Sequence, residues 1–201
     1  MVDGFKLHAG FFDRAAQEKL VVAVRLCLRD APLYTPAMPR SGKEFSVRMS
    51  NAGPLGWVSD REGGYRYQPH HPATGRPWPP IPDLLLQAWE ALSGYRAPPE
   101  ACLINWYGPG ARMGLHRDSD EQARDAPVLS VSLGDTAVFR IGGAEKGAKT
   151  GSLRLNSGDV AILDGAARES RHGVDRILPG TSTLLGAPGR INLTLRRVTI
   201  P

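Results

Sequence analysis

Apolar residues recur at helical spacing in two stretches of the first half of the chain. Asp13 is suited to cap a helix that runs to about Arg29 and stops at Asp30-Ala31-Pro32. A second helix is expected to start at Pro82 and to close at Gly94. The apolar stripes of the two helices are Leu20, Val21, Val24 and Leu28, and Leu84, Leu85, Ala88, Trp89 and Leu92. Each helix should therefore pack one face against another layer of the fold.

Beyond Gly94 the pattern changes to short apolar or alternating runs that are separated by turn residues. The expected strands are Cys102–Tyr107, Val128–Leu133, Ala137–Ile141, Leu153–Leu155, Val160–Leu163 and Arg190–Val198. Many short strands at this spacing indicate a double-stranded β-helix (jelly roll) or a barrel. We expect a mostly β fold with flanking helices (α+β), in which the N-terminal helices support the outside of one sheet.

Between the two helices the helical pattern is lost, and Pro, Gly and Ser interrupt the chain. Short strands are expected around Phe45–Met49 and Tyr65–Tyr67. A segment this long and irregular inside a compact fold is more often a lid or binding loop than filler. We expect one domain over residues 1–201, with a lid over about 36–80 and a jelly-roll core over about 101–198.

The composition is that of a globular protein, with 41% hydrophobic and 22% charged residues. No apolar run approaches the roughly 20 residues that a membrane span needs, and the start of the chain lacks the pattern of a signal peptide. Cys27 and Cys102 lie inside apolar runs, which favours buried thiols over a disulfide or a zinc site. We therefore expect a cytoplasmic protein that does not associate with membranes and works as a monomer.

The expected lid combines basic and aromatic residues. The chain as a whole carries a formal charge of +5, and the stretch from Arg40 to Arg76 is locally basic. Its aromatic and imidazole side chains are Trp57, Tyr65, Tyr67, His70 and His71. Interleaved basic and aromatic residues suit nucleic acid, because bases stack while phosphates are neutralised. A Pro/Gly-rich surface segment with solvated arginines explains the same pattern equally well.

His116 and Asp118 are separated by one residue, which places both side chains on one face of an extended segment. An imidazole and a carboxylate side by side make two-thirds of the arrangement of two histidines and one carboxylate that holds Fe(II). The tripeptide alone is more often an ordinary solvated strand end. His172 is the candidate for the third ligand, although a buried structural histidine is the simpler explanation of that residue.

The last expected strand alternates without a break from Arg190 to Arg196, and its polar face carries both arginines and Asn192. On the outside of a sheet this would be a plain amphipathic strand. Inside a jelly roll two arginines need anions. Their Cα atoms would stand roughly 20 Å apart, so that the inward-reaching side chains leave a gap suited to a short dicarboxylate. Asn105 and Tyr107 share a strand face and offer an amide and a phenol to the same ligand.

These motifs together resemble the AlkB family of Fe(II)/2-oxoglutarate-dependent dioxygenases. The residues that carry the resemblance are Asn105-Trp106-Tyr107, His116-x-Asp118, His172 and Arg190-x-Asn192-x(3)-Arg196, supported by Leu55-Gly56-Trp57, Pro77-Trp78-Pro79, Asp120-Glu121 and Gly158-Asp159-Val160. The resemblance runs from about Ser50 to Arg197 and is strongest to the bacterial enzymes that repair alkylated nucleic acid.

The resemblance implies a role for each of these residues. Fe(II) would be bound by His116, Asp118 and His172. Arg190 would hold the distal carboxylate of 2-oxoglutarate, and Arg196 the carboxylate next to the keto group. The side chains that would add hydrogen bonds to 2-oxoglutarate are Asn105, Tyr107 and Asn192.

The lid would cover a flipped-out nucleotide. Trp57 would stack on one face of the base, and His116 would lie under the other. Tyr65 and Lys146 would sit near the phosphates of the nucleotide, and Asp120 near the exocyclic amine of the base. Substrate binding would thus use residues from the lid, from the loop after His116 and from a later loop.

The implied reaction is oxidative demethylation of N-alkylated bases, such as 1-methyladenine and 3-methylcytosine, in DNA and preferably in single strands. It would consume 2-oxoglutarate and O2, produce succinate and CO2, and release the methyl group as formaldehyde. A demethylase or hydroxylase of RNA, including tRNA, is an alternative of the same family. A non-catalytic β-barrel that binds nucleic acid is an alternative of another class. A metal-dependent isomerase is disfavoured because it gives Arg190 and Arg196 no shared task.

Overall fold

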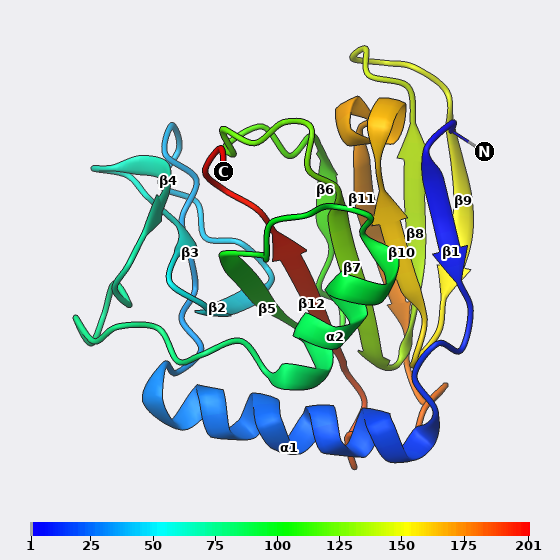
Figure 1. The fold of residues 1–201 in the computed structure, drawn as a ribbon, viewed down its shortest axis with the longest axis horizontal. Coiled ribbons are helices and arrows are strands. Elements are labelled where there is room, and N and C mark those ends of the chain that lie inside the picture. Colours follow the sequence, from blue (N-terminus) through cyan, green and yellow to red (C-terminus); the bar gives the residue numbers. More distant parts are fainter. Residues whose placement is uncertain (1) are drawn as a thin grey trace.

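The computed structural model describes residues 2–201, which form two helices, a 3-10 turn and twelve strands (Figure 1). In chain order the elements are β1 (Phe5–His8), α1 (Arg14–Asp30), β2 (Arg48–Ala52), β3 (Gly56–Asp60), β4 (Gly64–Gln68), α2 (Asp83–Leu92), β5 (Ala101–Tyr107), β6 (Met113–His116), β7 (Val128–Gly134), β8 (Thr136–Gly142), β9 (Thr150–Leu155), β10 (Val160–Leu163), η1 (Gly165–Glu169), β11 (His172–Leu178) and β12 (Arg190–Arg196). None of the helices in this part of the chain is long and apolar enough to cross a membrane.

Two antiparallel sheets build the core. The larger sheet has six strands in the order β1-β10-β7-β12-β5-β2, and the smaller has four in the order β6-β11-β8-β9. Strands that are distant in sequence, such as β12 between β5 and β7, are neighbours in the sheet, as a jelly roll requires. The expected fold class is confirmed. A third sheet, the β3–β4 hairpin, stands beside the core in the region expected to be a lid.

Both helices pack on the outer face of the larger sheet. Leu20 and Val24 of α1, and Leu85 and Trp89 of α2, join the buried cluster that contains Leu193 of β12. The side chain of Asp13 caps α1 by accepting from the backbone of Ala16, as expected. Gly94 follows α2 with φ of +65°, the left-handed conformation that ends a helix.

The alternation of β12 decides what lies between the sheets. Its apolar residues, Ile191, Leu193 and Leu195, belong to the cluster under the helices. Its polar residues therefore point the other way, between the two sheets, where a second apolar cluster includes Phe139 and Val174. This places Arg190 and Arg196 inside the jelly roll, so the outer-face explanation of their pattern is wrong.

Some element boundaries differ from those expected. The strand expected at Phe45–Met49 is β2, Arg48–Ala52, because the backbone N–H of Phe45 donates to Pro36 in a separate turn. The last strand ends at Arg196 and not at Val198. The N–H groups of Val198 and Thr199 leave the sheet and donate to the carboxylate of Glu100. Four strands, β1, β3, β6 and β11, were not expected, since each is brief or interrupted by glycine or charged residues.

Candidate active site

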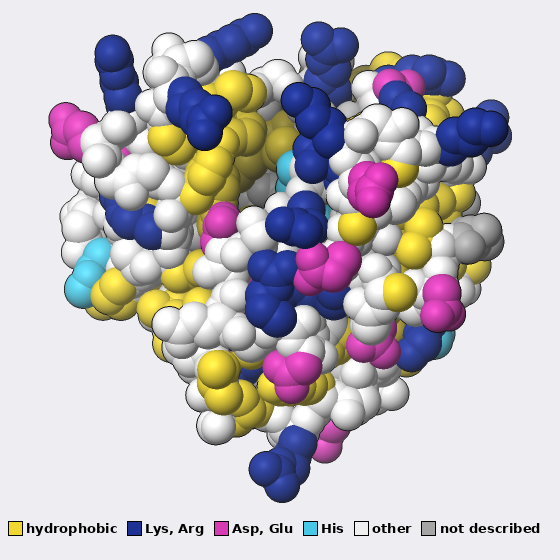
Figure 2. Space-filling model, turned by 90° about the horizontal axis from the view of Figure 1, so that it is seen from above, with side chains coloured by type: hydrophobic (Ala, Val, Ile, Leu, Met, Phe, Trp, Pro, Cys, Tyr) yellow, Lys and Arg dark blue, Asp and Glu magenta, His cyan; other side chains and the backbone are white. Residues whose placement is uncertain are grey.

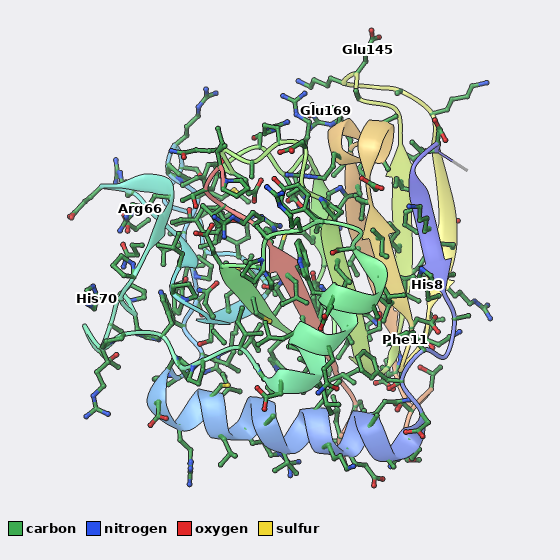
Figure 3. The ribbon with its side chains drawn as sticks, viewed as in Figure 1. His8, Phe11, Arg66, His70, Glu145 and Glu169 are labelled. Atoms are coloured by element: carbon green, nitrogen blue, oxygen red, sulfur yellow. The ribbon has the colours of Figure 1, made fainter. Side chains whose placement is uncertain are left out.

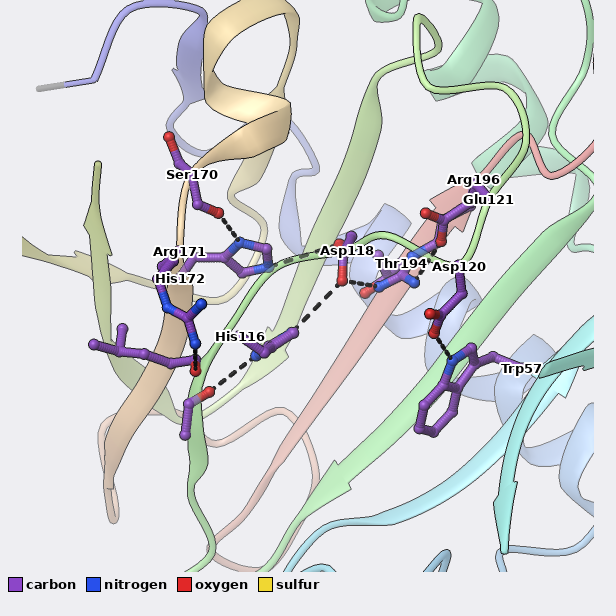
Figure 4. A network of polar contacts seen from close by, with 12 residues as sticks. Trp57, His116, Asp118, Asp120, Glu121, Ser170, Arg171, His172, Thr194 and Arg196 are labelled. Atoms are coloured by element: carbon purple, nitrogen blue, oxygen red, sulfur yellow. Dashed lines mark hydrogen bonds and ion pairs between the residues drawn. The ribbon is translucent and has the colours of Figure 1, made fainter. Parts of the chain in front are cut away.

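Strand pairing brings His172 to His116. His116 ends β6, His172 begins β11, and the two residues face one another directly in the β6–β11 ladder. Asp118 follows β6 by two residues, and its buried carboxylate lies to one side of the two imidazoles, where both Nε2 atoms face it (Figure 4). The Nε2 atoms of His116 and His172 each lie 3.6 Å from an oxygen of Asp118. One ligand atom from each residue lies within 4.8 Å of the others, so the three could hold one metal ion.

Backbone carbonyls fix the orientation of both imidazoles. Nδ1 of His116 lies 2.9 Å from the carbonyl oxygen of Gly114, and Nδ1 of His172 lies 3.2 Å from that of Ser170. A carbonyl can only accept, so each Nδ1 carries the hydrogen and donates it. Nε2 of each imidazole faces Asp118 and is the nitrogen available to a metal. Histidine ligands of metal sites are oriented in this way.

The protonation states also suit a metal. Burial lowers the pKa of His172 to about 4, so its imidazole is neutral near pH 7. Burial alone would raise the pKa of Asp118, but the charge of Arg196 and the nearby histidines hold it well below its usual range. Oδ2 of Asp118 is buried and has no hydrogen-bond partner among the described residues. Two imidazole nitrogens and one carboxylate oxygen on one side of a cavity form the donor set expected for non-haem Fe(II).

Arg190 is a buried cation surrounded by neutral acceptors. Its side chain is inaccessible to solvent and donates to Ser132 Oγ at 2.7 Å and to Asn192 Oδ1 at 3.2 Å. Among residues 2–201 it forms no ion pair, and its Nε lacks a partner. Burial lowers the pKa of Arg190 to about 10, which still leaves it charged at neutral pH. A buried guanidinium of this kind fits a carboxylate ligand such as the distal end of 2-oxoglutarate.

The neighbouring strand adds two further polar groups beside Arg190. In the β12–β5 ladder Arg190 faces Tyr107, and Asn192 faces Asn105. Burial raises the pKa of Tyr107 to about 12, so its phenol stays protonated and can donate. Oδ1 of Asn105 is buried without a partner in the described chain. Asn192 is already engaged, because it accepts from Arg190 and donates to Thr194.

Arg196 occupies the other end of the β12 polar face, and it is paired. Its Nη2 lies 2.8 Å from Oδ1 of Asp118, and its Nη1 lies 2.8 Å from Oε1 of Glu121. Glu121 also accepts from Tyr67 at 2.5 Å and pairs with Arg168 at 3.3 Å. No sequence motif predicted Glu121, Tyr67 or Arg168 as site residues. These residues form a buried polar network behind the three metal-ligand candidates.

Trp57 presents an aromatic surface to the same cavity. The side chain of Asn51 bonds both backbone groups of Trp57 at 3.0 Å, which fixes the start of the hairpin. The indole N–H donates to Asp120 Oδ2 at 2.8 Å. The ring stacks on Tyr65, with centroids 5.6 Å apart and planes inclined by 21°. Trp57, Tyr65 and Asp120 line a cleft of about 770 Å³, and this cleft is also lined by His116, His172, Arg190 and Arg196.

Comparison with known proteins agrees with this geometry. Residues 4–196 match the model of the 2OG-Fe(II) oxygenase superfamily. A relative from Caulobacter vibrioides, an alpha-ketoglutarate-dependent dioxygenase AlkB homolog, is 54% identical over 98% of this chain and 89% of its own length. The chain belongs to the AlkB family of dioxygenases. The alpha-ketoglutarate-dependent dioxygenase AlkB of Escherichia coli is 38% identical over 90% of this chain and 85% of its own length.

A solved structure supports the same assignment. OsALKBH1 superimposes with a TM-score of 0.78 at 32% identity, covering 96% of this chain and 98% of that one. The protein is thus an Fe(II)- and 2-oxoglutarate-dependent dioxygenase, and the family resemblance recognised in its motifs is confirmed. His116, Asp118 and His172 are its residues with the geometry to bind the metal.

The AlkB-family cleft is bordered by basic side chains. Figure 2 shows Lys and Arg side chains around a hollow with hydrophobic side chains inside it. Besides Arg190 and Arg196, the basic residues that line the cleft are Lys43, Arg112, Arg117 and Arg140. Lys43 belongs to the basic stretch expected to contact nucleic acid, whereas the three arginines were not predicted, because isolated arginines in strands and loops carry no motif.

Lys146 lies apart from this rim. It is exposed in the loop between β8 and β9, next to Glu145 at the tip of the loop (Figure 3), and is not among the residues that line the cleft. Its proposed contact with the phosphates of the nucleotide therefore remains a prediction. Of the twelve expected site residues, the other eleven line the cleft, namely Trp57, Tyr65, Asn105, Tyr107, His116, Asp118, Asp120, His172, Arg190, Asn192 and Arg196.

Proposed function

We propose that this dioxygenase demethylates N-alkylated bases, such as 1-methyladenine and 3-methylcytosine, in DNA by direct reversal. The observation that carries the proposal is that the metal-binding triad and the Trp57–Tyr65 pair line one cleft, with Arg190 at its inner end. A base stacked on Trp57 would present its methyl group toward His116, Asp118 and His172.

The reaction divides between cofactors and protein. Bound Fe(II), with O2 and 2-oxoglutarate, supplies the oxidising power that inserts one oxygen atom into the N-methyl C–H bond, while the co-substrate leaves as succinate and CO2. The resulting N-hydroxymethyl group releases formaldehyde and restores the base. In this proposal Arg190, Asn105 and Tyr107 hold the co-substrate by its distal carboxylate. Arg196 keeps Asp118 ionised and in place.

The lesion itself suits the hairpin side of the cleft. Methylation at N1 of adenine or N3 of cytosine blocks Watson–Crick pairing and makes the ring cationic, so the base is more easily extruded. The electron-rich face of Trp57 and the carboxylate of Asp120 attract a cationic ring. We propose a preference for single strands, in which no complementary strand has to be separated first.

Formaldehyde release tests the proposal directly. Purified protein with Fe(II), ascorbate and 2-oxoglutarate should release formaldehyde from a 1-methyladenine oligonucleotide, and His116→Ala should abolish the release. Arg25→Gln, on the exposed face of α1, is the matched control and should retain full activity. Succinate formation without formaldehyde would leave the dioxygenase assignment intact but refute the substrate. Equal activity of the wild type and of His116→Ala would favour a non-catalytic role.

Matched substrates separate the finer alternatives. Single-stranded DNA, duplex DNA and RNA of one sequence with the same lesion should be turned over with single-stranded DNA fastest. Faster turnover of the RNA would assign the enzyme to RNA. We also propose a monomeric enzyme in the cytoplasm, in keeping with two buried free thiols, Cys27 and Cys102. Light scattering at working concentration tests the monomer, and a dimer mass would overturn it.

A further inference from the structure

The outer face of the smaller sheet carries three exposed arginines. β8 and β9 alternate, so Phe139 and Leu153 point into the core between the sheets and the residues on either side of them point outward. In β11 a bulge between Val174 and Arg176 shifts the register, so Val174 points inward opposite Phe139 and Arg176 points outward opposite Val138. Arg140 on β8, Arg154 on β9 and Arg176 on β11 are all exposed. We call these three residues the arginine face.

Strand register brings the three side chains together. Val138 of β8 pairs with Arg154 on one side and with Arg176 on the other. Because neighbouring strands lie about 4.8 Å apart, the two arginines stand about 10 Å from one another across β8. Arg140 lies two residues along β8 from Val138, which is about 7 Å. It is flanked by Ser152, which has a small side chain, and by Gly173, which has none, and Arg140 is exposed.

Little negative charge offsets this group. Asp175 is the one acidic residue in the four strands β6, β8, β9 and β11, and it pairs with Arg176 at 3.1 Å. Arg140 donates to the hydroxyl of Thr150, which is neutral. In the described part of the chain Arg140 and Arg154 form no ion pair. Uncompensated cations this close together favour an anionic ligand with several charges.

The arginine face is continuous with the active-site cleft. Arg140, Gly173 and Asp175 line the cleft, and Gly173 directly follows His172 on β11. A chain that delivers a base to the metal triad would therefore leave the cleft beside Arg140. Its next charged groups would meet Arg176 and Arg154 on the adjoining strands.

We propose that the arginine face binds the phosphates of the nucleic-acid strand that flanks the flipped base. Guanidinium groups bind phosphate oxygens in a bidentate manner and carry no base specificity at the backbone. The proposal rests on the function proposed above and extends recognition beyond the nucleotide in the cleft. Phosphate contacts of this kind should make the affinity for nucleic acid increase with strand length and decrease with salt concentration.

Binding of an unmodified oligonucleotide tests the arginine face without catalysis. The triple variant Arg140→Gln, Arg154→Gln, Arg176→Gln is compared with the wild type by fluorescence anisotropy on a single-stranded 15-mer over a range of salt concentrations. Each lost phosphate contact should reduce the slope of log affinity against log salt by about 0.7, so the slope should fall by about 2. The matched control is the triple variant Arg14→Gln, Arg25→Gln, Arg29→Gln. It removes the same charge from exposed positions of α1, the helix that packs on the larger sheet. Equal slopes in the two triple variants would overturn the proposal.

Strand length supplies an independent measurement. For the double variant Arg154→Gln, Arg176→Gln, neither residue of which lines the cleft, the ratio of kcat/KM on a methylated 15-mer to that on a methylated trinucleotide should fall on the order of tenfold. An unchanged ratio would refute the arginine face while leaving the proposed function standing. If the wild type released no formaldehyde from either substrate, the proposed function would fail, and the salt dependence of binding would still decide the arginine face.

Discussion

Arg196 Nη2 lies 2.8 Å from Oδ1 of Asp118, so the last residue of β12 holds the carboxylate that faces the two histidines. The same guanidinium pairs with Glu121, and both acidic side chains are buried. Burial lowers the pKa of Arg196, but the two carboxylates and Tyr67 raise it well above its usual value. Arg196 is therefore a charged side chain held in place by two ion pairs, and it balances the negative charges of Asp118 and Glu121. This role does not depend on any contact of Arg196 with 2-oxoglutarate.

Replacing Arg196 by Met should destabilise the metal-free protein. Asp118 would lose its counter-charge, and Glu121 would keep Arg168 as its one ion-pair partner among the described residues. Breaking a buried ion pair from one side reduces the free energy of unfolding by about 3–5 kcal/mol, which urea denaturation would measure. Arg25→Gln on the surface should change the free energy of unfolding by less than about 0.5 kcal/mol. If Arg196→Met also changed the free energy of unfolding by less than about 0.5 kcal/mol, the ion pairs of Arg196 would not contribute measurably to stability.

Arg190→Met should have the opposite effect on stability. Arg190 is fully buried and donates to neutral acceptors, so an apolar side chain of similar volume should keep or raise the stability of the metal-free protein. Binding of 2-oxoglutarate should fall by about a hundredfold or more, because its carboxylate would lose a charged partner. Isothermal titration of 2-oxoglutarate into Mn(II)-loaded protein measures this loss. Unchanged binding would remove Arg190 from the co-substrate site.

The metal-free protein should lose stability in weak acid through His172. Its pKa of about 4 in the folded protein lies below the ordinary 6.5, so the unfolded chain takes up the proton first. The contribution of His172 is complete above pH 6.5 and is lost as the pH falls to about 4. The loss amounts to about 3 kcal/mol. Urea denaturation at pH 7 and pH 4.5 should show a smaller difference for His172→Gln than for the wild type. Identical pH profiles would contradict a neutral, buried His172.

Asp120→Asn should distinguish two roles of Asp120, the hydrogen bond that orients Trp57 and the negative charge near the base. The amide oxygen of asparagine can still accept from the Trp57 indole, so the melting temperature should stay within a few degrees of the wild type. The lost negative charge should raise KM for a 1-methyladenine substrate about tenfold, as expected for about 1.4 kcal/mol. Trp57→Phe, which keeps the ring but not the donor, is the companion variant. An unchanged KM in Asp120→Asn would show that Asp120 orients Trp57 and does nothing for the base.

Local pattern was sufficient for a large part of this protein. Some features depend on one helix or strand alone and can be predicted without knowing what it packs against. They are the apolar stripes of the helices, the Asp13 cap and the seven-residue alternation of Arg190–Arg196. The same holds for His116-x-Asp118, whose spacing places both side chains on one side of the chain. Together with His172 these motifs predicted the family, the fold class and the cofactors, and the comparisons confirm all three predictions.

Pairing between distant strands decided the rest. The ladder between β6 and β11 sets His172 opposite His116, and the network of Tyr67, Glu121 and Arg196 joins three separate segments. The arginine face likewise arises from register across β9, β8 and β11. Such contacts depend on which strands become neighbours, and that choice is made by burial of the whole core and not by any one stretch of residues. Local patterns therefore predicted the metal-ligand candidates and the arginine strand, whereas the pairing of distant strands decided which residues touch and added Tyr67, Glu121 and Arg168 to the site.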